Sequence, residues 1–182
     1  DLVPGTSHEA DIRQPDSHQL PALIPVADAM AGARLVSYPD YTASNPYQHG
    51  LYSAFRLSGE VEYGTIQRAL ELIATAAPDR PIIFHLHWPD PLFADVKDAF
   101  DYQSRASNFL RAVRAFKAMG GIFLWTIHNK LPHESAFGEV AADFHRRLAE
   151  AANIIHLHDD AAVAQVCQSY PIDQRKCIIV PH

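Results

Sequence analysis

The sequence predicts an α/β fold in which helices cover both faces of an open parallel sheet of about six strands. From Ala33 onward, short runs of β-branched and aromatic residues alternate with longer segments of helical period. The run at 81–87 is almost continuously apolar before its histidines, as expected for a strand covered on both faces. This alternation is typical of βαβ units, so the expected domain, residues 33–182, is Rossmann-like.

The expected strands are short and alternate with five helices. In chain order the strands are 34–38, 61–63, 81–87, 122–127, 153–157 and 176–180. The helices are 46–57, 65–77, 102–119, 138–151 and 160–169.

Local signals support the first three helices. Pro46 suits a first helical turn, and Thr65 is a suitable N-cap for the second helix. In the second helix, apolar residues recur at helical spacing at Ile66, Ala69, Leu70, Ile73 and Ala77. The third helix has one apolar face, and Gly120 and Gly121 end it.

Residues 1–32 differ from the rest of the chain. They contain four of the 13 prolines, and five acidic residues against one arginine give them a charge of −4 out of the total −6. We expect a linker or a loosely packed arm. Because the sequence lacks an initiator Met and stops just after an apolar run, the natural protein is expected to be longer at both ends.

Composition argues against several classes of protein. The net charge of −6 leaves no electrostatic footprint for nucleic acid. No apolar run approaches the roughly 20 residues that cross a bilayer, and the acidic N-terminus is unlike a secretion signal, so a cytoplasmic location is expected. Cys167 and Cys177 have no CxxC spacing and are expected to be buried, reduced thiols.

Six of the 11 histidines follow or end predicted strands, and they would share the carboxyl edge of the sheet. They are His85, His87, His128, His156, His158 and His182. Imidazole can donate, accept or carry charge near pH 7, which suits a site that handles sugar hydroxyls and phosphates. The simpler alternative is that each is a tolerated polar residue at a solvated strand end.

A metal site is another alternative. The two HLH segments, 85–87 and 156–158, each place two imidazoles on one strand face, a spacing that can ligate zinc in a metal-dependent hydrolase. The nearby acids Asp90, Asp159 and Asp160 follow no recognised ligand order. The expectation is therefore no metal.

Five segments together resemble a known family. They are YPDYTASNPYQHGLY (38–52), IIFHLHWPDPLF (82–93), GGIFLWTIHNKLPHE (120–134), ANIIHLHDDAA (152–162) and CIIVPH (177–182). They are similar to the N-terminal domain of bacterial glycosyltransferases of the GT-B fold, closest to glycosyltransferase family four, whose members build polysaccharides. The resemblance implies that this chain is one half of a GT-B fold and that the C-terminal donor domain is absent.

The resemblance also implies roles for particular residues. His128 would be the catalytic residue, contacting the transferred sugar and orienting it against the acceptor hydroxyl. His87 and Trp88 would face the same cleft, where an indole ring can stack on a pyranose. The remaining expected substrate-binding residues are Asp40, Asn45, Tyr47, Gln48, Asn129 and Glu134. Asp40 and Asn45 could equally cap loops. Glu134 could instead be an acid in the first turn of a helix, where the helix dipole favours a negative charge.

The implied activity is transfer of a hexose from a nucleotide sugar to a polysaccharide or lipid-linked saccharide, with retention at the anomeric carbon. No cofactor is required, the nucleotide sugar being a co-substrate held mainly by the missing domain, and this fragment alone is expected to be inactive. The loop after the first strand has no glycine before Gly50, unlike the glycine-rich turn of many family members, so the resemblance does not extend to a phosphate contact from this half.

Two further possibilities concern partners. The basic residues of the helix at 102–119 could touch anionic lipid at the inner membrane, although a solvated surface helix is the simpler interpretation. They are Arg105, Arg111, Arg114 and Lys117. The domain could also be a non-catalytic module that binds a saccharide or a partner protein within a longer chain.

Overall fold

The structure, a computed structural model, describes residues 32–128 and 137–181. Its centre is one six-stranded sheet in the order β2-β1-β3-β4-β5-β6, and every pair of neighbouring strands is parallel. The strands are β1 (Arg34–Tyr38), β2 (Glu60–Tyr63), β3 (Ile82–Leu86), β4 (Ile122–Thr126), β5 (Ile154–Leu157) and β6 (Cys177–Ile179). The predicted α/β fold with an open parallel sheet is confirmed.

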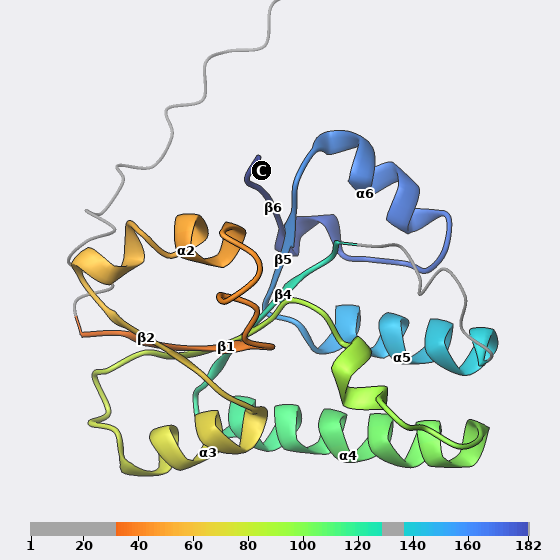
Figure 1. Cartoon of the computed structure of the whole chain (residues 1–182), viewed down its shortest axis with the longest axis horizontal. Helices are drawn as coiled ribbons and strands as arrows, with labels where there is room; N and C mark the ends of the chain where they lie inside the picture. Colours follow the sequence, from red (N-terminus) through yellow and green to blue (C-terminus); the bar gives the residue numbers. More distant parts are fainter. Residues whose placement is uncertain (1–31, 129–136, 182) are drawn as a thin grey trace, which may run out of the picture.

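Helices connect successive strands and lie on both sides of the sheet. Figure 1 shows α3, α4 and α5 below the sheet and α2 above it, with α6 at the upper right beside β5. The α-helices are α2 (Tyr47–Leu51), α3 (Ile66–Thr75), α4 (Ala99–Ala118), α5 (Gly138–Ala151) and α6 (Asp160–Cys167). Short 3-10 helices are η1 (Phe55–Leu57), η2 (Asp90–Phe93) and η3 (Gln174–Lys176).

The two faces of the sheet have different cores because successive strand residues point to opposite faces. On the face of α3, α4 and α5, the larger core includes Val36, Phe84 and Phe123. On the opposite face, a small cluster contains Leu35, Tyr52 and Ile83. Tyr52 directly follows α2, so the α2 segment places the Tyr52 side chain over this second face of the sheet.

The prediction of one helix over residues 46–57 is wrong. The chain forms the short helix α2, ends it at Tyr52, and then forms η1. Gly50 and Ser53 are weak helix formers, and the ring of Tyr52 is buried against the sheet.

Two smaller expectations also differ from the structure. Helix α4 begins at Ala99 rather than at residue 102, because the Asp98 carboxylate caps it by accepting a hydrogen bond from Asp101 N at 2.7 Å. The cysteines are free, as expected, but they are not buried: Cys167 is exposed and Cys177 is partly exposed. Helix α6 buries only Val166, so its neighbour Cys167 faces solvent.

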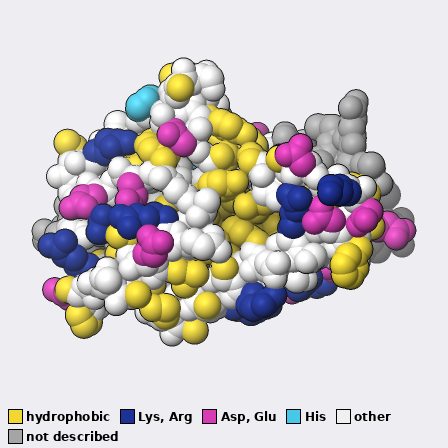
Figure 2. All heavy atoms as spheres, turned by 60° about the horizontal axis from the view of Figure 1, so that its bottom comes forward, with side chains coloured by type: hydrophobic (Ala, Val, Ile, Leu, Met, Phe, Trp, Pro, Cys, Tyr) yellow, Lys and Arg dark blue, Asp and Glu magenta, His cyan; other side chains and the backbone are white. Residues whose placement is uncertain are grey.

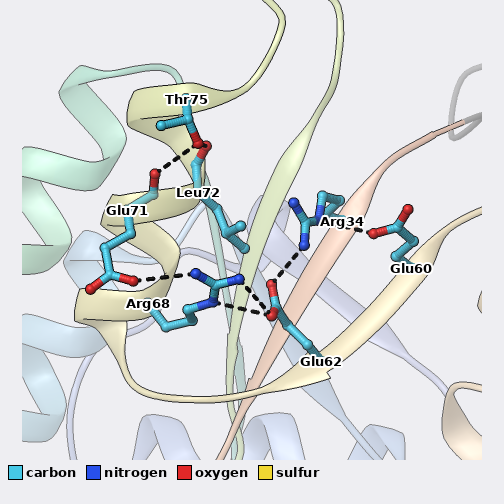
Figure 3. A network of polar contacts seen from close by, with 7 residues as sticks. All are labelled: Arg34, Glu60, Glu62, Arg68, Glu71, Leu72 and Thr75. Carbon is cyan, nitrogen blue, oxygen red and sulfur yellow. Dashed lines mark hydrogen bonds and ion pairs between the residues drawn. The ribbon is translucent and has the colours of Figure 1, made fainter.

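Charged side chains line the outer edge strand β2. Arg34 on β1 pairs with Glu60 at 3.1 Å and with Glu62 at 3.3 Å. Arg68 on α3 continues the network to Glu62 and to Glu71 (Figure 3). The edge strand therefore carries two glutamates that pair with arginines of β1 and α3, rather than an apolar strip.

Several predictions fall outside the described residues. They are the predicted arm at residues 1–32, of which only Gly32 is described, the predicted site residues Asn129 and Glu134, and the histidine His182.

Candidate functional site

The polar residues near the carboxyl ends of the central strands share one face of the sheet. His85 follows Ile83 on β3 by two residues, so it lies on the face of the smaller core. The register of the parallel strands places Ser37 beside His85 and Thr126 beside His156. All four side chains are buried. In the register of β3 and β4, His85 is opposite Leu124, so Thr126 and His156 lie two residues further along the sheet but on the same face, and the buried polar row crosses β1, β3, β4 and β5 obliquely.

Tyr52 joins this row to the histidine that follows β3. Its hydroxyl oxygen lies 2.7 Å from His85 Nδ1, 2.6 Å from His87 Nε2 and 3.0 Å from Ser37 Oγ. The rings of His85 and His87 stack with their centroids 4.1 Å apart. The HLH spacing thus places two imidazoles on one face, as predicted.

His87 and His128 lie together, as the predicted site requires. His87 Nδ1 is 3.3 Å from His128 Nε2, and His128 Nδ1 is 3.2 Å from His158 Nε2. Trp88 stacks on His128 with ring centroids 4.1 Å apart and an interplanar angle of 12°. The ends of β3, β4 and β5 therefore contribute to one cluster.

Tyr47 at the start of α2 covers this cluster. Its ring meets the rings of His87, His128 and His158 nearly edge-on, at centroid distances of 5.9, 5.6 and 5.6 Å. Burial raises the pKa of the Tyr47 hydroxyl to about 12, so the group is a neutral phenol at pH 7. Tyr47, a predicted substrate-binding residue, therefore lies against the histidines.

Burial keeps the inner histidines uncharged. Burial, with smaller contributions from the nearby His128, His156 and His158, lowers the pKa of His87 from 6.5 to about 3. The pKa of His85 lies well below 6.5, again mainly because of burial and then because of His87. At pH 7 these rings can donate and accept hydrogen bonds but carry no charge.

The predicted site residues in and just after the loop that follows β1 differ in burial: Gln48 is buried, whereas Asp40 is exposed. Gln48 is fully buried, and its amide bonds Pro39 O at 2.8 Å and Tyr41 N at 2.9 Å, so it holds the loop in place. The Asp40 carboxylate accepts hydrogen bonds from Thr42 in the exposed part of the loop. Asn45 caps the start of α2 by accepting from Tyr47 N at 3.0 Å.

Two cavities adjoin the cluster. A small one of about 20 Å³ is lined by residues that include Trp88, Asp90, Trp125, His128 and His145, and it is too small for a sugar ring. A groove of about 540 Å³ runs beside α2, lined by Asn45, Pro46, Tyr47, Gly50, Leu51, Val180 and Pro181. Only the groove has the volume of a small-molecule site, and Tyr47 separates it from the histidines.

No metal site is evident in the described ranges: no group of three or more His, Cys, Asp or Glu residues is placed to share one ion. The ring nitrogens of His85 and His87 are engaged instead by hydroxyl groups and by a neighbouring imidazole.

Sequence reasoning missed three members of the cluster: Ser37, Tyr52 and Thr126. None is a histidine, and although Tyr52 and Thr126 lie within segments that carry the resemblance, no role was expected for them. The strand register would have indicated Ser37 and Thr126, because each is paired with a histidine of the neighbouring strand. Tyr52 could not be found in this way, since it reaches the row from the segment after α2.

No protein-family model matches the sequence, and no curated protein matches it significantly. Neither comparison therefore assigns the chain to a family. No helix among residues 32–128 and 137–181 is long and apolar enough to cross a bilayer.

Proposed function

We propose that this chain is the acceptor-side half of a two-domain glycosyltransferase of the GT-B fold. In the full-length protein it would hold a saccharide while a second domain supplies a hexose from a nucleotide sugar. One observation carries the proposal: uncharged imidazoles and the aromatic rings of Tyr47 and Trp88 gather at the carboxyl edge of a parallel sheet, where ligands of such sheets bind.

The chemistry of the cluster suits a carbohydrate. Sugar hydroxyls both donate and accept hydrogen bonds, as neutral imidazoles do, and the apolar face of a pyranose stacks on aromatic rings. A charged cluster would favour an anion instead. The groove beside Tyr47 has about 540 Å³, which falls in the range of small-ligand sites and is enough for a saccharide.

Within this proposal, His128 would contact the transferred sugar, and Trp88 would stack on the acceptor. Asn45 and Tyr47 would contact the saccharide from the groove, since both line it. Asp40, Asn129 and Glu134 remain predicted substrate contacts. Gln48 would act by holding the loop, because its amide is occupied by that loop.

Saccharide binding by the chain is the first test. Ligand-observed NMR with a panel of free and lipid-linked oligosaccharides should detect binding, and Trp88→Ala should weaken it about tenfold, or roughly 1.4 kcal/mol. Phe100→Ala is the matched control, because Phe100 is an aromatic residue 80% exposed on α4. Equal binding by wild type and Trp88→Ala would contradict the proposed site.

Transfer by the full-length protein is the second test. Incorporation of labelled hexose from a nucleotide sugar should require the second domain, and His128→Ala should abolish it. Saccharide binding without transfer would favour the non-catalytic binding module. Stoichiometric zinc together with hydrolytic activity would favour the metal-dependent hydrolase.

A further inference from the structure

Seven side chains and one carbonyl group form a continuous series of hydrogen bonds across the sheet. It begins at His158 and ends at Val180 O. The contacts in order are His158 Nε2 to His128 Nδ1 (3.2 Å), His128 Nε2 to His87 Nδ1 (3.3 Å), His87 Nε2 to Tyr52 OH (2.6 Å), Tyr52 OH to His85 Nδ1 (2.7 Å), His85 Nε2 to Thr126 Oγ1 (2.7 Å), Thr126 Oγ1 to His156 Nδ1 (2.9 Å) and His156 Nε2 to Val180 O (3.1 Å).

The carbonyl end fixes the direction of this series. A carbonyl oxygen only accepts, so His156 Nε2 carries the hydrogen that bonds Val180 O. In a neutral imidazole the other nitrogen then accepts, which makes the Thr126 hydroxyl the donor to His156 Nδ1. Because that hydroxyl has a single hydrogen, its oxygen must accept from His85 Nε2.

The same reasoning continues through Tyr52. His85 Nδ1 must accept, so the Tyr52 hydroxyl donates to it. Its oxygen then accepts from His87 Nε2 and from the hydroxyl of Ser37, 3.0 Å away. Burial raises the pKa of the Tyr52 hydroxyl, and the hydrogen bond with Ser37 lowers it by a smaller amount. This lowering agrees with Ser37 as the donor.

The outer part of the series follows in turn. With its hydrogen on Nε2, His87 accepts at Nδ1 from His128 Nε2. His128 then accepts at Nδ1 from His158 Nε2. Every member has one allowed orientation once the histidines are neutral, and the strongly lowered pKa values of His85 and His87 support that condition.

We propose that Tyr52 and Thr126 are positioning residues which, together with the carbonyl of Val180, hold all five histidines as the tautomer with hydrogen on Nε2. A residue in the interior of the sheet thereby determines which nitrogen of His128 is an acceptor. The assignment concerns the protein alone and does not depend on what the site binds.

The tautomer determines which nitrogen of His128 accepts a hydrogen bond from a ligand and which donates one. This step rests on the proposed function. The two contacts of His128 are the longest in the series, so a sugar hydroxyl can enter most easily there. A hydroxyl that enters between His128 and His158 would donate to His128 Nδ1 and accept from His158 Nε2. His128 Nδ1 would then accept a hydrogen bond from the hydroxyl of the saccharide that receives the hexose, rather than donate one to it.

The test is a long-range ¹H–¹⁵N NMR spectrum of the chain, labelled at histidine, at neutral pH. We expect protonated Nε2 and bare Nδ1 for His85, His87, His128, His156 and His158. His145 is an internal control, because its Nδ1 lies 2.8 Å from Ala141 O and must therefore carry the hydrogen. A wild-type spectrum in which His85 or His87 is protonated at Nδ1, or charged, would overturn the proposal.

Variants separate positioning from stability. In Thr126→Val the spectrum of His85 should change from one tautomer to a mixture, and in Tyr52→Phe both His85 and His87 should change. Thr126→Ser keeps the hydroxyl and should restore the wild-type pattern. Folding of each variant is checked by its backbone amide spectrum. Unchanged tautomers in folded Thr126→Val and Tyr52→Phe would show that these residues do not position the imidazoles.

Discussion

The uncharged state of His85 and His87 links the site to the stability of the whole domain. In the folded protein their pKa values lie far below 6.5, whereas the unfolded chain protonates them at the ordinary value. The stabilising effect is therefore fully present above about pH 6.5 and is lost as the pH falls. Between pH 6 and pH 5 we expect the free energy of unfolding to decrease by about 2 kcal/mol for the pair.

Urea denaturation at a series of pH values measures this decrease. The His49→Gln variant is the control for the loss of a histidine outside the cluster, because His49 lies on the exposed side of α2. A free energy of unfolding that stays constant between pH 6 and pH 5 would show that the two histidines are charged in the folded state.

Helix α4 depends on the residue before it, Asp98, for a defined start. The Asp98 carboxylate accepts from Asp101 N, and Asp101 in turn pairs with Arg105. Replacing Asp98 by Ala removes the cap, so we expect the free energy of unfolding to fall by about 1 kcal/mol. Thermal unfolding followed by circular dichroism measures the loss. Asp79→Ala, an exposed aspartate in the turn before β3, should have little effect; an equal loss in both variants would argue against capping.

The turn from α4 into β4 has no room for a side chain. A Cβ on Gly121 would lie 2.4 Å from the ring of Phe116, which is fully buried. Gly121→Ala must displace that ring and should destabilise the protein by about 1 to 3 kcal/mol. Gly138→Ala at the start of α5 is the matched control, since nothing lies within 4 Å of its Cβ position. Similar urea midpoints for both variants would contradict this account.

Elements with strong periodicity were predictable, whereas the α2 segment was not. The apolar face of α4 and the nearly continuous apolar run of β3 are local patterns, and both were predicted from sequence. The end of α2 depends on the burial of Tyr52 against β1 and β3, which are distant in sequence. Long-range packing of this kind leaves no local period to detect.

At the scale of the whole molecule, the surface offers little to a membrane. Two of the four basic residues of α4 are used within the protein: Arg105 pairs with Asp101, and Lys117 donates to Ala151 O. Of these four, Arg111 and Arg114 are exposed, and Arg111 also donates to Asn108 Oδ1. Figure 2, in which the lower half of Figure 1 comes forward, shows acidic and basic side chains interspersed around a hydrophobic middle.

We therefore expect weak binding to vesicles that contain anionic lipid, at about 1 kcal/mol for each exposed arginine. The double variant Arg111→Glu/Arg114→Glu should abolish it in a sedimentation assay at low salt. Arg80→Glu/Arg175→Glu changes the net charge equally at exposed positions away from α4 and should retain it. If both double variants bind equally, peripheral contact through α4 is wrong.

The gathering of the histidines followed from the sequence because parallel strands bring their carboxyl ends to one edge. His87 and His128, 41 residues apart, lie within hydrogen-bonding distance as this rule requires. The rule could not predict that the imidazoles bond one another, because this depends on side-chain direction and on Tyr52. The sugar, the donor and the reaction remain proposals.

The two edge strands of the sheet, β2 and β6, would present different side chains to a strand of another polypeptide. At β2, an incoming strand would encounter Arg34, Glu60 and Glu62. At β6, it would meet Ile178 and Ile179, which are 45% and 40% exposed. Unpaired strand edges without charges invite aggregation. A lysine in place of Ile178 should therefore improve the solubility of this chain more than any added charge beside β2.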